Sequence, residues 1–183
     1  MEKKYIGLLL GIILLIMPVT AGVTTKRLNA TEWNLCINAN AGGGITYCYI
    51  GEKTNALDGL DQYDVCHPPF FPPGRAFIFC QETSFPEPYT NLLYEYKHHS
   101  GYKVFNFTSF YYPSGATGAY ITLSWARQTL QSSGYRYVYL MLNGQIILDM
   151  KNIETYIFWS NPYQFLQFKI TCTNMPLSII VNK

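Results

Sequence analysis

The sequence predicts an all-β protein, an antiparallel β-sandwich of the jelly-roll or immunoglobulin-like type with about ten short strands. Aromatic residues make up 16% of the 183 residues, whereas charged residues make up only 13%. Aromatic side chains favour the pleated, half-buried surface of a strand. Short runs of alternating apolar and polar residues recur between clusters of Gly, Pro, Asn and Ser, which is the spacing of a sandwich. After the first segment no apolar stripe has helical spacing, so we expect no helix there.

Residues 1–21 predict a signal peptide rather than part of the fold. Lys3 and Lys4 precede the apolar run Ile6–Met17, and small residues follow up to Ala21. We expect cleavage after Ala21, which leaves residues 22–183 as a single β-sandwich domain; the alternative is an uncleaved N-terminal anchor. The mature chain is therefore expected to be secreted or at the cell surface, and to meet a membrane only through an uncleaved N-terminal segment.

The first two strands are expected at Trp33–Ile37 and Ile45–Ile50, joined by a glycine-rich turn. Residues 51–74 contain too much Pro, Asp and Gly for regular structure, and we expect them to form a rigid, extended cover over the sheet. A polar connection is expected at 128–134, and Asn143-Gly144 is a strong hairpin signal. The later strands are expected at Ala76–Phe79, Leu92–Tyr96, Tyr102–Thr108, Ile121–Trp125, Tyr135–Leu142, Gln145–Met150, Tyr156–Trp159, Leu166–Ile170 and Leu177–Val181.

Five cysteines in an exported chain indicate disulfides. Cys36 and Cys48 are equidistant from the middle of the first turn, so symmetric pairing of its two strands would place their sulfurs opposite each other. Cys66 and Cys80 flank the proline-rich segment and form the second candidate pair. Cys172 is then left over, either as a buried free thiol or as one half of an intermolecular bridge.

Asp58, Asp61 and Asp64 recur at every third position in the Asp- and Pro-rich segment. Carboxylates at this spacing could wrap a calcium ion, and Gly59 would permit the bend. The competing interpretation is that they cap turns by accepting backbone N–H bonds. We expect no cofactor other than a structural calcium ion under the first interpretation.

No catalytic constellation is visible, so we expect no enzyme. The sequence contains no G-x-S-x-G and no H-E-x-x-H motif, and nothing in it brings two carboxylates together. It also has no closely spaced cysteine pair for zinc. The net charge of +2 comes from scattered Lys and Arg residues, so no nucleic-acid partner is expected.

Tyr135, Tyr137 and Tyr139 predict an aromatic face, because they alternate with the apolar Val138 and Leu140. Aromatic planes on a β-surface can stack on sugar rings or contact another protein. The alternative is a second packed face beneath a loop.

Two positions match the acceptor pattern for N-glycosylation, Asn29 and Asn106. Asn29 lies in an expected exposed lead-in, whereas Asn106 lies inside a strand pattern. Both are candidates for a glycoprotein, and Asn29 is the better one.

Several motifs between Trp33 and Thr171 follow a common pattern. Its specific part is A-x-DG-x-D…D-x-P-x-PP-x-PP, read here as Ala56–Asp61, Asp64, Pro68-Pro69 and Pro72-Pro73. The weaker parts are Trp33-x-Leu35-x-Ile37, Leu123-Ser124-Trp125, Asp149-Met150, Thr155–Phe158 and Phe168-x-Ile170. This pattern resembles a secreted β-sandwich module of bacterial and archaeal surface proteins, often found beside a C-terminal secretion or anchoring domain. Tyr102 replaces a tryptophan of the pattern, Ala126 replaces an acidic residue, and the cysteines are not part of it. The resemblance implies a sandwich fold and extracellular placement, with no defined activity or ligand.

The sequence therefore predicts a non-catalytic module with a structural or protein-interaction role. Its expected partners are other surface proteins or further copies of itself in a surface assembly. The alternative is a carbohydrate-binding module that holds glycans on the tyrosine face. A third hypothesis is donor-strand assembly, in which Gly22–Glu32 or Leu177–Val181 adds to the sheet edge of a neighbour.

Overall fold

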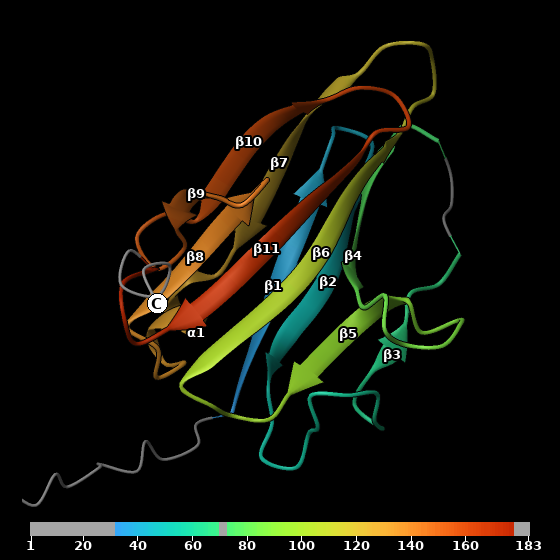
Figure 1. Cartoon of the computed structure of the whole chain (residues 1–183). Coiled ribbons are helices and arrows are strands. Elements are labelled where there is room, and N and C mark those ends of the chain that lie inside the picture. Colours follow the sequence, from blue (N-terminus) through green and yellow to red (C-terminus); the bar gives the residue numbers. More distant parts are fainter. Residues whose placement is uncertain (1–31, 70–72, 178–183) are drawn as a thin grey trace, which may run out of the picture.

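The structure, a computed structural model, describes residues 32–69 and 73–177 (Figure 1). These residues form eleven strands and one short helix, so the all-β class is confirmed. The elements are β1 (Trp33–Asn40), β2 (Ile45–Glu52), β3 (Val65–Cys66), β4 (Arg75–Gln81), β5 (Asn91–Lys97), β6 (Tyr102–Tyr112), β7 (Ala119–Trp125), α1 (Arg127–Gln131), β8 (Tyr137–Leu142), β9 (Gln145–Asp149), β10 (Thr155–Ser160) and β11 (Phe165–Thr173). The expected signal peptide and Asn29 lie outside the described residues.

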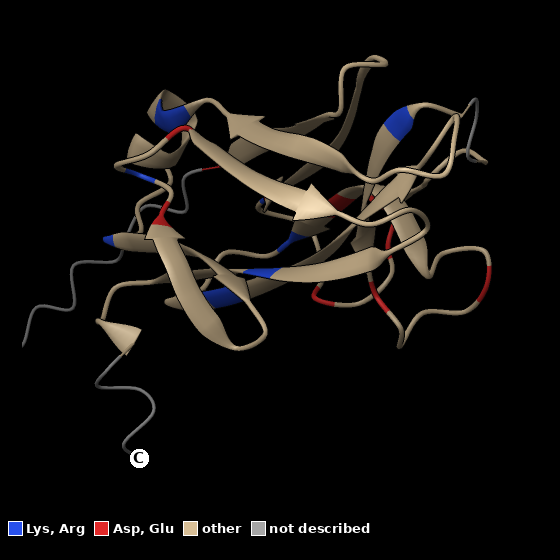
Figure 2. Ribbon diagram, turned by 90° about the horizontal axis from the view of Figure 1, so that it is seen from above, with Lys and Arg blue, Asp and Glu red and all other residues tan. Residues whose placement is uncertain are grey.

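The strands form one continuous sheet in the order β10-β7-β1-β2-β5-β4-β6-β11-β8-β9, with β3 paired to β5. The expectation of a wholly antiparallel arrangement is wrong, because β2 and β5 run parallel. The sheet curls around the core, as the view from above makes clear (Figure 2). The curl brings Phe158 of β10 to a ring-centroid distance of 5.2 Å from Phe168 of β11, although six strands separate β10 from β11 along the sheet.

The core fills the inside of this curl. β1 has the alternation of a half-buried strand, since Trp33, Leu35 and Ile37 are buried and the residues between them are more exposed. On the other side of the core, Phe107 and Phe168 stack with ring centroids 5.1 Å apart. Apolar burial on one face of each strand therefore decides which way the sheet curls.

The Asp- and Pro-rich segment covers part of the outer face. His67 packs edge-on against Phe79 of β4 at a centroid distance of 5.8 Å, and β3 pairs with β5. Residues 76–80 of β4 are consequently buried on both faces. The contact of His67 with β4 fits the expected cover, but the expectation of no regular structure is wrong for residues 51–52, which end β2, and for residues 65–66, which form β3.

Two details differ from the expectations. The connection after β7 contains α1, which has one buried residue, Leu130, and no side-chain cap. A single buried leucine gives no periodic stripe, which is why the sequence pattern missed this helical turn. The expected strand at Leu177–Val181 lies outside the described residues apart from Leu177. Within the described ranges, no helix has the length and apolar character needed to cross a membrane.

Candidate functional site

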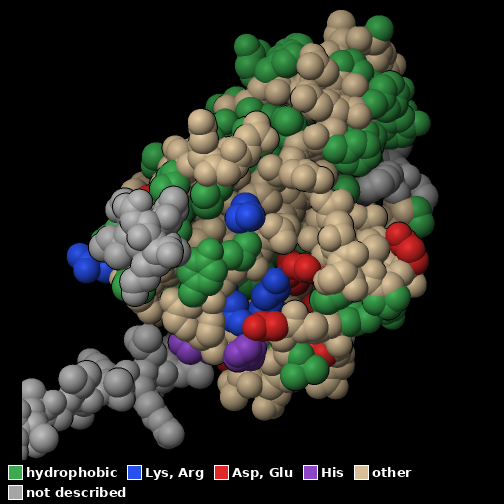
Figure 3. All heavy atoms as spheres, viewed as in Figure 1, with side chains coloured by type: hydrophobic (Ala, Val, Ile, Leu, Met, Phe, Trp, Pro, Cys, Tyr) green, Lys and Arg blue, Asp and Glu red, His purple; other side chains and the backbone are tan. Residues whose placement is uncertain are grey.

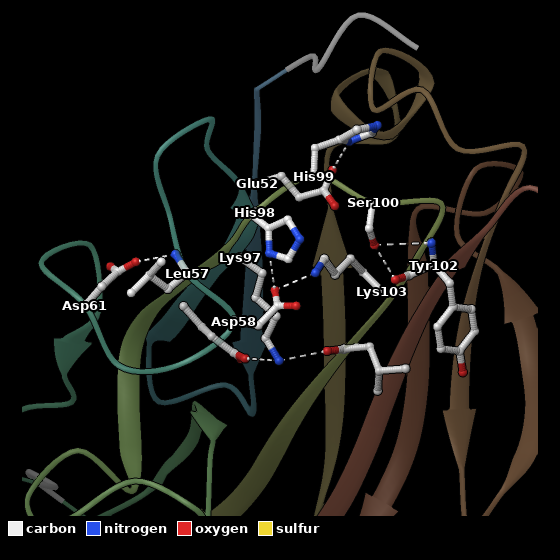
Figure 4. A network of polar contacts seen from close by, with 12 residues as sticks. Glu52, Leu57, Asp58, Asp61, Lys97, His98, His99, Ser100, Tyr102 and Lys103 are labelled. Carbon is white, nitrogen blue, oxygen red and sulfur yellow. Dashed lines mark hydrogen bonds and ion pairs between the residues drawn. The ribbon is translucent and has the colours of Figure 1, made fainter. Parts of the chain in front are cut away.

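The turn between β5 and β6 is the centre of a polar network that holds one end of the molecule together (Figure 4). Glu52, at the end of β2, is almost fully buried. Its Oε2 atom lies 2.8 Å from both Trp33 Nε1 and His99 Nδ1, and its Oε1 atom lies 2.5 Å from the Tyr135 hydroxyl. A buried carboxylate is stable when such donors surround it. Glu52 therefore ties together β1, β2, the turn and the segment before β8.

Tyr135 belongs to the group of side chains that surrounds Glu52, which we call the hub, rather than to an exposed face. Its side chain is 2% exposed, and its hydroxyl also lies 2.8 Å from the carbonyl oxygen of Ser100. Burial first, and then the hydrogen bond to Glu52, raises the pKa of Tyr135. The phenol is therefore held in its protonated form.

Asp58 makes the second part of the network. Its carboxylate pairs with the buried ammonium group of Lys103, and its Oδ1 atom lies 3.0 Å from His98 Nδ1. Partial burial alone would raise the pKa of Asp58, but the hydrogen bond and charge of Lys103, with the charge of His98, outweigh it and lower the pKa. This pair fastens the covering segment to β6.

The three aspartates do not converge on a common point. Asp61 accepts hydrogen bonds from the backbone N–H groups of Leu57 at 2.6 Å and of Tyr63 at 2.7 Å. Asp64 accepts one from the N–H of Asp61 at 2.9 Å, and burial raises its pKa. In residues 32–69 and 73–177 no group of three or more His, Cys, Asp or Glu side chains could hold a metal ion. The geometry of Asp61 and Asp64 is that of turn caps, the competing interpretation above.

Two carboxyl groups do meet, contrary to expectation, around Lys97. Its Nζ atom lies 3.0 Å from Glu82 Oε1 and 2.8 Å from Glu95 Oε1, and it donates to the carbonyl oxygen of Val104 at 3.0 Å. Burial raises the pKa of Glu95 well above its ordinary value, and the charge of Lys97 offsets part of this effect. Glu95 is 1% exposed, so its carboxyl group is closed off from solvent.

The tyrosine face contains two of its three expected members. Tyr137 and Tyr139 are half-buried on the outer face of β8, with stacked rings whose centroids are 5.6 Å apart. Tyr135 precedes β8 and points into the hub, so its assignment to this face is wrong. Met141 continues the same face and borders a depression of about 350 Å³. Amide and other polar side chains line that depression: Gln81, Thr83, Asn106, Asn143, Gln167 and Lys169.

The glycosylation candidate Asn106 therefore lies on the sheet itself. It is half-buried in β6, opposite Lys169 of β11. The following Thr108 is buried and donates to Gln81 Oε1 at 2.8 Å. In the folded chain the acceptor residue is a wall of the depression rather than the tip of a loop.

The expected disulfide pairs do not face each other, and all five cysteines are free thiols. The hairpin pairs Cys36 with Tyr49 and Cys48 with Ile37, so the two cysteines lie on opposite faces. Cys66 of β3 and Cys80 of β4 both pair with Leu92, so β5 lies between them. Two strand spacings amount to about 9.5 Å, too far for a disulfide. Cys172 is buried in the core, which fits the free-thiol alternative.

An exposed aromatic surface, which the sequence did not single out, lies on β7 and β10. We call Tyr120, Ile157 and Trp159 the Trp159 surface; these side chains are 67%, 60% and 49% exposed. The rings of Tyr120 and Trp159 meet edge-to-face with centroids 5.1 Å apart. Apolar side chains gather at the upper end of the molecule in Figure 3, whereas charged and histidine side chains gather at the lower end. The only sequence signal was the run Tyr156–Trp159, which is apolar at consecutive positions.

No family model, curated protein or solved structure matches this chain.

Proposed function

We propose that the chain is a secreted or cell-surface module without catalytic activity, which acts by binding another protein subunit. Under this proposal the curled sheet is a variant of the jelly-roll or immunoglobulin-like sandwich, and the resemblance of the Asp- and Pro-rich segment reflects a common module. The Trp159 surface is the part of the chain that binds the other subunit.

The observation that carries the proposal is the rigid exposure of Trp159. Its indole lies over Gly118, meets Tyr120 edge-on, and donates from Nε1 to Asn161 Oδ1 at 3.2 Å. About half of the side chain nevertheless remains open to solvent. An aromatic residue that is fixed before binding loses little conformational entropy on binding, which is why such residues dominate the energy of protein interfaces.

The edge of the sheet supports a second copy of this chain as the partner. β10 is an end strand, and no other strand in the described ranges pairs with its outer edge. Natural edge strands are usually protected by Lys, Pro or a bulge, and Thr155–Ser160 contains neither charge nor proline. Two β10 strands paired antiparallel about a two-fold axis would satisfy both edges and bring the two Trp159 surfaces together.

Self-association of the mature chain tests this proposal. We expect sedimentation velocity to give a concentration-dependent dimer for the parent, and a monomer for Ile157→Lys and Trp159→Ala. Ile146→Lys is the matched control, because Ile146 is 48% exposed on β9, the other end strand of the sheet. A monomeric parent at all concentrations, or an equal effect of Ile146→Lys, would contradict the assignment of β10.

A specific observation also favours carbohydrate binding as a second candidate. The stacked pair Tyr137 and Tyr139 shares the outer face of β8 with Met141, which borders the polar depression. Sugars stack on aromatic planes, and their hydroxyl groups hydrogen-bond to amides such as Gln81 and Gln167. Polysaccharide pull-down by the parent, lost in both Tyr137→Ala and Gln167→Ala, would support this function. Absence of polysaccharide binding by the parent would contradict the carbohydrate-binding function and leave protein binding as the remaining candidate.

A further inference from the structure

Cys48 and Cys80 lie on neighbouring strands that no backbone ladder joins. β2 and β4 run side by side, since Thr46 Oγ1 donates to the carbonyl oxygen of Ala76 at 2.8 Å. Further along, the Cys80 thiol lies 3.5 Å from the carbonyl oxygen of Tyr49, the residue after Cys48. Within the described ranges, the sheet path connects β2 to β4 only through β5. Side-chain contacts, rather than a backbone ladder, therefore hold these two strands together along the seam between them.

Both thiols face the core at this seam. Cys48 and Cys80 are fully buried members of the main hydrophobic cluster. Burial first, and then the neighbouring Cys48 thiol, raises the pKa of Cys80. The contacts of Thr46 with Ala76 and of the Cys80 thiol with the carbonyl oxygen of Tyr49 place the two cysteines on adjacent strands, one beside the other.

The other cysteines have no comparable neighbour. The hairpin register places Cys36 on the face opposite to Cys48, and β5 separates Cys66 from Cys80. Cys172 of β11 lies near Glu52 and Lys151, whose charges act on its thiol. Among the five cysteines, geometry thus favours one pair that neither spacing nor symmetry in the sequence selected.

We propose that Cys48 and Cys80 form a disulfide that pins β2 to β4 when the chain folds in an oxidising compartment. Formation joins the two sulfurs and releases two protons and two electrons. A disulfide-bearing oxidant, such as oxidised glutathione or an oxidised dithiol oxidoreductase, accepts them by thiol–disulfide exchange. Because both thiols are buried in the folded chain, the exchange takes place before the strands close, and the finished bond is shielded from reductants.

Peptide mapping of the mature chain, refolded in glutathione buffer and blocked with N-ethylmaleimide, tests the pairing. Cleavage after Lys and Arg separates residues 28–53, 54–75 and 76–97, which contain Cys36 with Cys48, Cys66, and Cys80 respectively. The proposal expects peptide 28–53 joined to 76–97 under non-reducing conditions. Because 28–53 contains two cysteines, the same map of Cys36→Ser decides between them; Cys36 is on the outer face and its replacement leaves the core unchanged.

Each result of this map has a definite meaning. A link between 28–53 and 76–97 that persists in Cys36→Ser supports the Cys48–Cys80 bond. A link that disappears in Cys36→Ser, a link of 76–97 to 54–75, or an internal bridge within 28–53 overturns it. Blocking of all five thiols after oxidative refolding also overturns it.

Discussion

The indole of Trp159 lies directly over Gly118, in a space that a larger residue would occupy. A Cβ atom at Gly118 would come within 2.7 Å of the indole ring and 2.3 Å of the carbonyl oxygen of Ser160. The missing side chain therefore lets the connection before β7 pass close to β10. The close packing on Gly118 fixes the orientation of Trp159, on which the proposed function depends.

Gly118→Ala should consequently displace Trp159 and lower the free energy of unfolding by about 1–3 kcal/mol, because backbone and ring must both move. Trp33 and Trp125 are buried, so Trp159 is the solvent-exposed tryptophan. Its displacement should therefore change the intrinsic fluorescence of the protein. Chemical denaturation and fluorescence measure both effects. Gly115→Ala is the control, since a Cβ there meets nothing within 4 Å. Equal stability of the two variants would contradict the close packing.

Tyr135→Phe should destabilise the protein, because it removes the hydroxyl group between Glu52 Oε1 and the carbonyl oxygen of Ser100. Loss of one partner of a buried acceptor costs about 1–3 kcal/mol. Tyr137→Phe, in a half-buried residue of the outer face, should stay within about 0.5 kcal/mol of the parent. Thermal denaturation compares the two substitutions. An equal loss of stability in Tyr135→Phe and Tyr137→Phe would contradict a stabilising role for the hydrogen bonds of Tyr135.

The free energy of unfolding should fall as pH rises above the ordinary pKa of glutamate, because of Glu95. Burial raises the pKa of Glu95 well above 4.5, so the folded chain keeps a proton that the unfolded chain releases. Stability from this group is therefore complete below pH 4.5 and declines until the folded carboxyl ionises, by at most about 1.4 kcal/mol per pH unit. Denaturant titrations between about pH 5 and pH 8 measure this slope.

Glu95→Gln separates this effect from other groups, since glutamine resembles the protonated acid. In the variant the free energy of unfolding should fall less steeply with pH than in the parent. The variant should therefore become more stable than the parent as pH rises. Glu82, Lys97 and Cys80 face the same group and remain in both proteins. A constant difference between parent and variant over this pH range would refute the assignment to Glu95.

The first hairpin illustrates how much of the fold the sequence could predict. The strands and their turn were predicted correctly, but the register was wrong by one residue. The apolar pattern contained the answer: Leu35 faces the core from an odd position, whereas Cys48 and Ile50 do so from even positions. Facing residues of an antiparallel pair share one side of the sheet, so Leu35 must pair with Ile50 rather than Tyr49. Symmetry about the turn was a weaker criterion than burial.

The sites depend on contacts that no local pattern contains. Glu52 meets Tyr135 across 83 positions of the chain, and the parallel pairing of β2 with β5 fixes where Lys97 lies. Trp159 is exposed because it lies on the outer face of β10, opposite to the buried Phe158, and no other element covers it in the part of the chain that the structure describes. An apolar segment such as Thr155–Ser160 gives no sign of whether it is central or at an edge, because periodicity reports burial only when one face is polar.

Asp61→Ala should lower the free energy of unfolding by about 1–2 kcal/mol, because its carboxylate caps the N–H groups of Leu57 and Tyr63. The loss should be the same with calcium and with a chelator, as expected for a turn cap. Thermal denaturation under both conditions measures it. A parent that calcium stabilises, together with a variant that it does not, would restore the metal interpretation of the aspartates.

The oxidised chain should unfold at a higher temperature than the fully reduced chain if Cys48 and Cys80 are joined. Closing the loop between them stabilises the folded state by about 3.7 kcal/mol in the chain-entropy model, which corresponds to a shift of about 10 °C for a chain of this size. The comparison uses protein refolded with oxidised glutathione and protein refolded with a reductant. Cys36→Ser should keep the whole shift, whereas the double variant Cys48→Ala/Cys80→Ala should unfold at one temperature in both conditions. A shift that survives in the double variant would assign the stabilisation to another pair of cysteines.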